Sequence, residues 1–323
     1  MAVITLEEVR QGQVSDLQKG VIDEFTKGDF LFQNIPFDKI ANPVKGGAGW
    51  SVSYVKLTEE SKTGFRAING KYEDTHAKKK PATAEVKVYG GSFSIDRALR
   101  DQGGVEDEVA FQMGQLIKAA KKGFSYYLIN GSTSTAGEQF DGLDTLLKGT
   151  STDMEADAAG FDLSTFEKTK EKALEFAIKL DEFLSLLDEK PNCLLGNSKM
   201  ILKIKAAAKI AGLHSVTQNS YGETIDNYNG IPLVSLEKYI PKGETAAKET
   251  IDIAEDGTTS LYAVRFGEDA LCVASPSAGD IIDVIPPDFT VAAEQARGLV
   301  ELRGVPILKS SKACGVLRKI KVQ

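Results

Sequence analysis

The sequence predicts an α+β fold that contains one helix of unusual length. Between Val105 and Leu128, apolar residues recur every three or four positions, which is the spacing of one helix face. Before this stretch, and again after Ile225, apolar and polar residues alternate as they do in β-strands. We therefore expect an N-terminal arm, a long hairpin, a long helix, a mixed middle and a β-rich end.

The composition is that of an ordinary soluble globular protein. The chain has 323 residues, enough for two domains, with 42% hydrophobic and 26% charged residues. A formal net charge of -7 disfavours tight binding to nucleic acid through the average surface. The three cysteines are far apart and lack metal-ligand spacing, so we expect free, buried thiols in a reducing compartment. We expect no signal peptide and no membrane contact, because no apolar run approaches a membrane span.

The first 40 residues predict an arm that begins with a short helix. Leu17, Val21 and Phe25 form a helical stripe that Gly28 ends, and residues 30–37 then read as an extended apolar tract. Such an arm cannot fold alone. It must lie on the body of the protein or on a neighbouring subunit.

Two alternating stretches predict a long hairpin. The first surrounds Trp50 and Tyr54, and the second runs from Ala84 to Ile95. The polar and basic residues between them, about 58–82, form a tip longer than most loops in compact domains. The glycine-rich segment 46–49 would be a hinge at the base. A flexible surface loop is the alternative interpretation of this region.

The long helix carries signals at both ends and two glycines inside. Acidic residues 106–108 fill its first turn and lysines lie towards its end, which is the charge order that the helix dipole favours. Asn130 and Gly131 predict a left-handed cap. Gly114 and Gly123 each lower helix stability, so we expect another backbone to pass close to both, and we expect Gly114→Leu to impair folding or assembly.

The second half predicts helices followed by strands. Residues 163–189 form a charged, helix-rich region in which Phe166, Leu174, Ile178 and Leu184 have helical spacing. A short buried strand follows at 192–196, and Asn197 then caps a helix that Gly212 ends. From Ile225 to the C-terminus the pattern is one of short strands, the last at 315–322.

No residue pattern predicts a catalytic, cofactor-binding or metal site, so we expect a protein that is not an enzyme. His76 and His214 have no nucleophile or carboxylate motif beside them, and we expect both to face solvent. The adjacent acids at 181–182 and 188–189 do not share a helix face and indicate solvated positions. Lysines 78–80 would contact nucleic acid or an acidic neighbour, or simply keep the tip soluble.

The order of these parts resembles the major capsid protein of tailed bacteriophages, which has the Hong Kong 97-type fold. The resemblance covers nearly the whole chain. It is carried by residues 92–104 before the long helix, by 128–147 after it with the sequence Phe140-Asp141-Gly142-Leu143, by 229–241, and by 297–318. The resemblance implies a phage major capsid fold with an N-terminal arm, an extended β-hairpin loop, a long spine helix in a peripheral domain and an inserted axial domain. The limits would be 1–47 for the arm, 48–95 for the extended loop, 96–144 and 281–323 for the peripheral domain, and 145–280 for the axial domain.

The same resemblance implies a function in assembly. Copies of the chain would form hexamers and pentamers of an icosahedral shell around double-stranded DNA, with separate scaffolding and portal proteins. The DNA would be contacted weakly and without specificity. The protein would assemble in the cytoplasm of the host bacterium and end in the virion. One alternative is an encapsulin, a bacterial protein compartment that packages an enzyme and whose cargo would dock near residues 17–25. Another is an unrecognised enzyme or a tail-associated structural protein.

Overall fold

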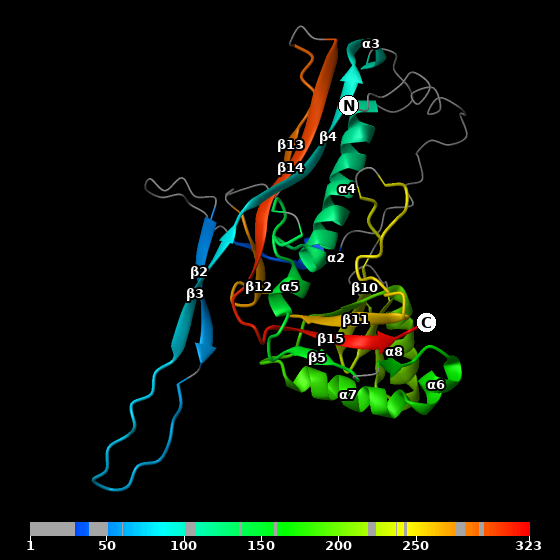
Figure 1. The fold of residues 1–323 in the computed structure, drawn as a ribbon. Coiled ribbons are helices and arrows are strands. Elements are labelled where there is room, and N and C mark those ends of the chain that lie inside the picture. The colour runs from blue at the N-terminus through cyan, green and yellow to red at the C-terminus, as the bar shows by residue number, and fades with distance from the viewer. Residues whose placement is uncertain are drawn as a thin grey trace.

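The computed structural model describes residues 30–38, 51–59, 61–100, 108–135, 137–157, 160–218, 224–236, 238–241, 244–275, 282–290 and 294–323. Two expectations from the sequence, the helix around 17–25 and the hinge at 46–49, lie outside these residues. The described chain has two β-sheets, a long helix and a two-stranded hairpin that projects from the body (Figure 1).

The smaller sheet is organised around one long strand. Its five strands have the order β1-β12-β14-β13, and β4 pairs with β14 as well. Pairing of β4 with β14 is antiparallel and runs from Asp96 opposite Gln295 to Lys87 opposite Gly304. The first part of β14 alternates buried and more exposed residues, as expected of a sheet with one covered face. The strands are β1 Phe37–Asp38, β4 Lys87–Asp96, β12 Leu271–Ala274, β13 Ile282–Ile285 and β14 Gln295–Leu308.

The predicted long helix is present as α4, Glu108–Asn130, and packs along β4 and β14 (Figure 1). Its buried side includes Phe124 and Leu128 in the main core. The predicted left-handed cap is wrong, because Gly131 does not have a positive φ. Glycine is required at position 131 for a steric reason instead, because a Cβ there would lie 2.5 Å from the carbonyl oxygens of Phe140 and Tyr127.

The hairpin consists of β2, Ser51–Glu59, and β3, Lys78–Glu85, paired antiparallel. After Val86 the chain continues into β4, so the predicted second strand is divided between the hairpin and the smaller sheet. The segment before the hairpin was expected to be extended. It forms a short helix instead, α2 Phe30–Asn34, followed by β1. Helix α2 buries Leu31 in the main core, and Ile35, one helical turn later, lies in the same core.

The larger sheet forms the other end of the molecule. Its order is β5-β15-β11-β7-β10-β9-β8, with β6 also paired to β15. Three helices, α6, α7 and α8, lie beside this sheet (Figure 1). The strands are β5 Asp153–Glu155, β6 Phe161–Asp162, β7 Cys193–Gly196, β8 His214–Gln218, β9 Thr224–Tyr228, β10 Ile231–Ser235, β11 Thr258–Val264 and β15 Cys314–Lys321. The helices not yet given bounds are α3 Arg97–Arg100, α5 Leu143–Leu147, α6 Phe166–Glu171, α7 Ala173–Ser185 and α8 Ser198–Ala211.

Helix α8 has the predicted ends. The Asn197 side chain accepts a hydrogen bond from the Lys199 amide at 2.9 Å, and Gly212 ends the helix with φ of 74°. The apolar spacing read for the preceding helices was misleading, because Phe166, Leu174 and Ile178 are exposed. Helix α7 buries a different face, which consists of Ala173, Phe176, Ala177, Leu180 and Phe183.

The domain limits stay a prediction, but two strands pair with strands from the other predicted domain. Strand β12, from the segment predicted as axial, pairs with β14 in the smaller sheet. Strand β15, from the segment predicted as peripheral, pairs with β11 and β5 in the larger sheet. The C-terminal chain therefore connects the two sheets covalently and by strand pairing.

Candidate assembly surfaces

The most exposed part of the described chain is the hairpin tip. Every residue from 61 to 77 is exposed, including Phe65, Ile68 and Tyr72. The local contacts come from the tip itself: the Arg66 guanidinium lies 5.3 Å from the Tyr72 ring centroid and donates to the Gly70 carbonyl oxygen at 3.2 Å. Large apolar side chains on a projecting loop are typical of a surface that packs against another molecule.

The base of the hairpin is attached to the body. Val52 of β2 is buried in the main core, and Tyr54 and Ala84 pack against the same core. The lysines at 78–80 lie on the exposed part of β3, with Lys80 opposite Lys56 across the pair. Burial, together with the charge of Lys80, lowers the pKa of Lys56. The hairpin therefore has a buried base, and the segment from residue 61 to Lys80 is exposed and rich in basic residues.

A second set of exposed apolar residues lies on the helices beside the larger sheet. Leu174 and Ile178 of α7 are 63% and 69% exposed, and Leu202 of α8 is 63% exposed. A helix that packs only on its own sheet normally presents polar residues to solvent. These positions are therefore candidates for contact with another chain.

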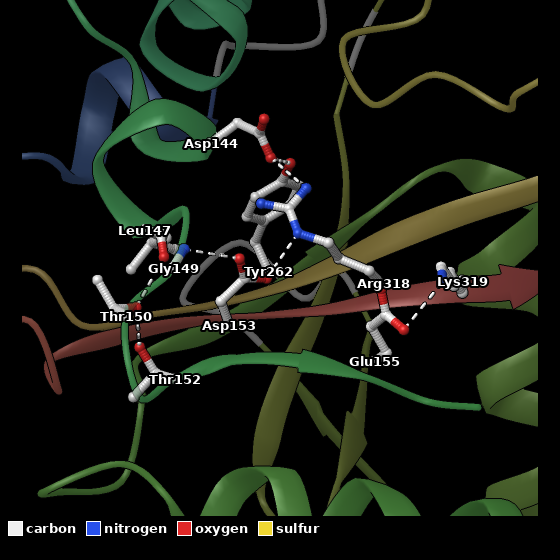
Figure 2. A network of polar contacts seen from close by, with 10 residues as sticks. All are labelled: Asp144, Leu147, Gly149, Thr150, Thr152, Asp153, Glu155, Tyr262, Arg318 and Lys319. Carbon is white, nitrogen blue, oxygen red and sulfur yellow. Dashed lines mark hydrogen bonds and ion pairs between the residues drawn. The ribbon is translucent and has the colours of Figure 1, made fainter. Parts of the chain in front are cut away.

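A polar network joins the region after the long helix to the larger sheet (Figure 2). The Arg318 guanidinium on β15 donates from Nε to Asp153 Oδ1 at 2.6 Å and from Nη1 to Asp144 Oδ1 at 2.7 Å. The Tyr262 hydroxyl of β11 donates to the same Asp144 oxygen at 2.8 Å. Burial raises the pKa of Tyr262 far above its ordinary value, and the charge of Asp144 adds to this.

The other carboxylate oxygen of Asp153 holds the turn that follows α5. Asp153 Oδ2 accepts from the Gly149 amide at 3.0 Å, and the Thr150 hydroxyl donates to the Leu147 carbonyl oxygen at 2.7 Å (Figure 2). Arg318 thus connects α5, β5 and β11 to the C-terminal strand. The sequence offered no signal for this network, because its members are separated by up to 174 residues. Both carboxylate oxygens of Asp153 and Oδ1 of Asp144 accept hydrogen bonds, whereas Arg318 Nη2 is buried without a hydrogen-bond partner among the described residues.

The histidines were expected to face solvent, and this is correct only for His76. His214 is partly buried, and its Nε2 lies 2.9 Å from Asp226 Oδ1. Asp226 also pairs with Lys205, and these contacts, with Lys205 first, lower the pKa of the carboxyl group. The expectation for His214 failed because the sequence did not reveal strand β8, which places His214 against β9.

The acidic pairs and the cysteines are the remaining candidates from the sequence. The predicted solvated acids at 181–182 and 188–189 are exposed, and Asp181 accepts a hydrogen bond from the Tyr228 hydroxyl at 2.9 Å. The three cysteines are free and buried, as predicted, and burial raises the pKa of Cys272 to about 11. Among the described residues, no three His, Cys, Asp or Glu side chains are grouped as a metal site would require. No helix in the described ranges is long and apolar enough to cross a membrane.

The two glycines of α4 differ in their surroundings. At Gly123, an added Cβ would overlap the Tyr89 hydroxyl and lie 2.8 Å from Tyr239 Cε2. The close approach predicted there is real, although it involves tyrosine side chains rather than a backbone. At Gly114, no described atom lies within 4 Å of the added Cβ, so the predicted close approach of another backbone is not found among the described residues.

Comparisons with known proteins give structural matches and no sequence match. No family model matches the chain, and no curated protein matches it. Among solved structures, the holo-SrpI encapsulin complex from Synechococcus elongatus PCC 7942 matches with a TM-score of 0.64 at 14% identity, over 98% of this chain and 97% of that one. A structure of Mycobacterium phage Bobi matches with a TM-score of 0.58 at 9% identity, over 98% and 99%. The capsid of Myoviridae phage XM1 matches with a TM-score of 0.53 at 12% identity, over 99% of both chains.

These matches span the full length of both partners, so they concern the whole arrangement of hairpin, long helix and two sheets rather than a shared fragment. At such low identity they establish the fold. The chain has the Hong Kong 97-type capsid fold, as its sequence predicted.

Proposed function

We propose that this chain is the major capsid protein of a tailed bacteriophage. Copies assemble into hexamers and pentamers of an icosahedral shell that encloses double-stranded DNA. The role is structural rather than enzymatic. The full-length likeness to the capsid of a Myoviridae phage supports this proposal.

The observation that carries the proposal is the hairpin tip. Residues 61–77 are all exposed, and Phe65 and Ile68 are more than 90% exposed in the single chain. Large apolar side chains in water are unfavourable by roughly 1.5–3 kcal/mol each relative to burial. A second copy of the chain, repeated by symmetry, would bury them without any additional partner.

Other partners follow from the same proposal. Scaffolding and portal proteins would be separate chains, and the packaged DNA would be contacted weakly because the chain carries a net charge of -7. Assembly would take place in the bacterial cytoplasm and the product would be the virion. The domain limits given from the sequence belong to this proposal, with the arm at 1–47 and the extended loop at 48–95.

An encapsulin-type compartment is the second candidate. It is favoured by the match to an encapsulin, whose TM-score of 0.64 over 98% of this chain exceeds those of the two phage structures reported above. In that case the shell would package a protein instead of DNA. Both candidates require the same chain to close into a shell, and they differ in what the shell contains.

The first experiment is expression of the full chain in a bacterium, followed by size-exclusion chromatography and negative-stain electron microscopy. Regular shells, or hexamers and pentamers that close when a scaffolding protein is supplied, would support the proposal. A chain that stays monomeric under all of these conditions would contradict it.

The contents of the particle separate the two candidates. Particles purified from the natural source would be treated with nuclease and then analysed for protected nucleic acid and for additional proteins. Protected double-stranded DNA supports the phage capsid. One abundant cargo protein without DNA supports the compartment.

A further inference from the structure

Two helices beside the larger sheet present exposed faces of opposite charge. Helices α7 and α8 contact each other, and both contribute to the core beneath the sheet. On the outer side, the acidic helix face combines Leu174 and Ile178 with carboxylates one helical turn away. We define this face as Glu171, the last residue of α6, together with Leu174, Glu175, Ile178 and Glu182 of α7, all of which are exposed.

The basic helix face lies on α8. This helix contains four lysines and no acidic residue between Ser198 and Ala211. Leu202 and Ile210 are 63% and 46% exposed. We define the basic helix face as Lys199, Leu202, Lys203, Lys209 and Ile210. Each of the two faces therefore has an aliphatic centre with charge of a single dominant sign around it.

Half of the six charged groups on these faces are left available by the chain itself, and Lys199 is not among them because it donates to the Gln323 side chain. Within the described residues, Glu171, Glu175 and Lys209 have no ion-pair partner. Glu182 pairs with Lys179 at 3.0 Å, and Lys203 donates to the Ser164 carbonyl oxygen at 2.8 Å. Complementary charge around an apolar centre is the pattern of a specific protein interface, in which charge selects the partner.

We infer that the acidic helix face of one copy packs against the basic helix face of the next copy around a ring. This inference rests on the proposed self-assembly and names one of its contacts. The occupant is a second copy because one chain carries both complementary faces. Since the two faces are different surfaces, the contact is heterologous. Contacts of this kind close into a ring when the rotation from one copy to the next divides a full turn evenly.

The helix contact is small, so neighbouring copies in a ring would have to touch at further places as well. Helices of 13 and 14 residues are about 20 Å long, so one helix pair buries less than the roughly 800 Å² per partner of a standard interface. The helix contact would therefore set register and partner choice, and the hairpin would add further buried area.

A charge-exchange experiment tests the inference in the full chain. One variant carries Glu171→Lys and Glu175→Lys, a second carries Lys199→Glu and Lys209→Glu, and a third carries all four changes. Because like charges would meet across the contact, each two-residue variant should lower the yield of rings or shells at least about tenfold. The four-residue variant restores opposite charges and should recover assembly to within about threefold of the unmodified chain.

Two control variants show that the effect is local. Glu255→Lys and Lys148→Glu change exposed charges outside both faces and should leave the yield unchanged. Thermal unfolding of each purified variant verifies that it is folded. If the unmodified chain assembles and the two-residue variants assemble equally well, the inference is overturned while the proposed function stands. Failure of the four-residue variant to recover would also overturn it, and an unmodified chain that never assembles would overturn both.

Discussion

The Tyr89 hydroxyl occupies the space beside Gly123 in which any larger residue would place its Cβ. Gly123→Ala should therefore destabilise the subunit by about 1–2 kcal/mol, since overpacking outweighs the gain of about 1 kcal/mol in helix propensity. Chemical denaturation of the unassembled subunit measures this difference. Adding Tyr89→Phe removes the overlapping oxygen and should recover part of the loss.

Gly114 is the matched control on the same helix. With no described atom within 4 Å of its added Cβ, Gly114→Ala should stabilise the subunit by about 0.5–1 kcal/mol. Gly114→Leu should also leave the subunit folded, contrary to the folding defect expected from the sequence. A loss of stability at Gly114 as large as that at Gly123 would contradict this interpretation.

Removing the Arg318 side chain should destabilise the attachment of α5 to the larger sheet. In Arg318→Met, Asp144 and Asp153 lose their common cation while remaining partly buried, so we expect a loss of about 2–3 kcal/mol. The control is Lys319→Met, whose ion pair with Glu155 is about half exposed and should contribute less than about 1 kcal/mol. Equal losses in urea denaturation for the two variants would show that the Arg318 network adds no more stability than an exposed ion pair.

Lowering the pH should reduce the stability of the N-terminal end of α6. Lys168 first, and then Ser164, hold the pKa of Asp162 well below its usual range. A carboxyl group whose pKa is lowered by folding stabilises the protein above its unfolded pKa of about 3.9, and this contribution is lost as the pH falls through the folded value. Asp162→Asn should therefore be less stable than the unmodified chain at pH 7, and the difference should shrink below about pH 4. A difference independent of pH would contradict this assignment.

The hairpin tip should matter for assembly and not for folding. Replacing residues 60–77 with Asn-Gly joins β2 to β3 by a two-residue turn and removes only exposed residues among those described. The melting temperature of the subunit should change by no more than about 2 °C, because a surface loop adds little to stability. The yield of shells should fall to background. Normal assembly of this variant would exclude the tip as an interface.

The parts of the fold that could be predicted were those with strong local signals. The long helix, the hairpin and the cap at Asn197 each have a repeating pattern or a specific end residue within a short stretch. What failed depended on distant partners. His214 was expected in solvent because strand β8, which contains it and pairs with β9, was not predicted. The apolar spacing around Leu174 gave the exposed face of a helix rather than its buried one.

The candidate surfaces could be predicted only in part. The hairpin tip was singled out because it is too long for an ordinary loop, and its exposure fits that interpretation. The Arg318 network was missed because Asp144 and Asp153 look like ordinary surface acids in sequence. The opposite charges of the two helix faces became visible only when burial showed which side of each helix faces outward.

The pairing of β4 with β14 has a consequence for how the chain is made. Asp96 and Gln295 are opposite each other in the sheet, although almost two hundred residues separate them. Pairing across such a distance requires a large loss of chain entropy before any contact forms, which makes it a slow step. During translation, β4 and the side of α4 remain without this partner until β14 has been synthesised. The smaller sheet therefore cannot form around its central strand until about two hundred residues have been added after β4.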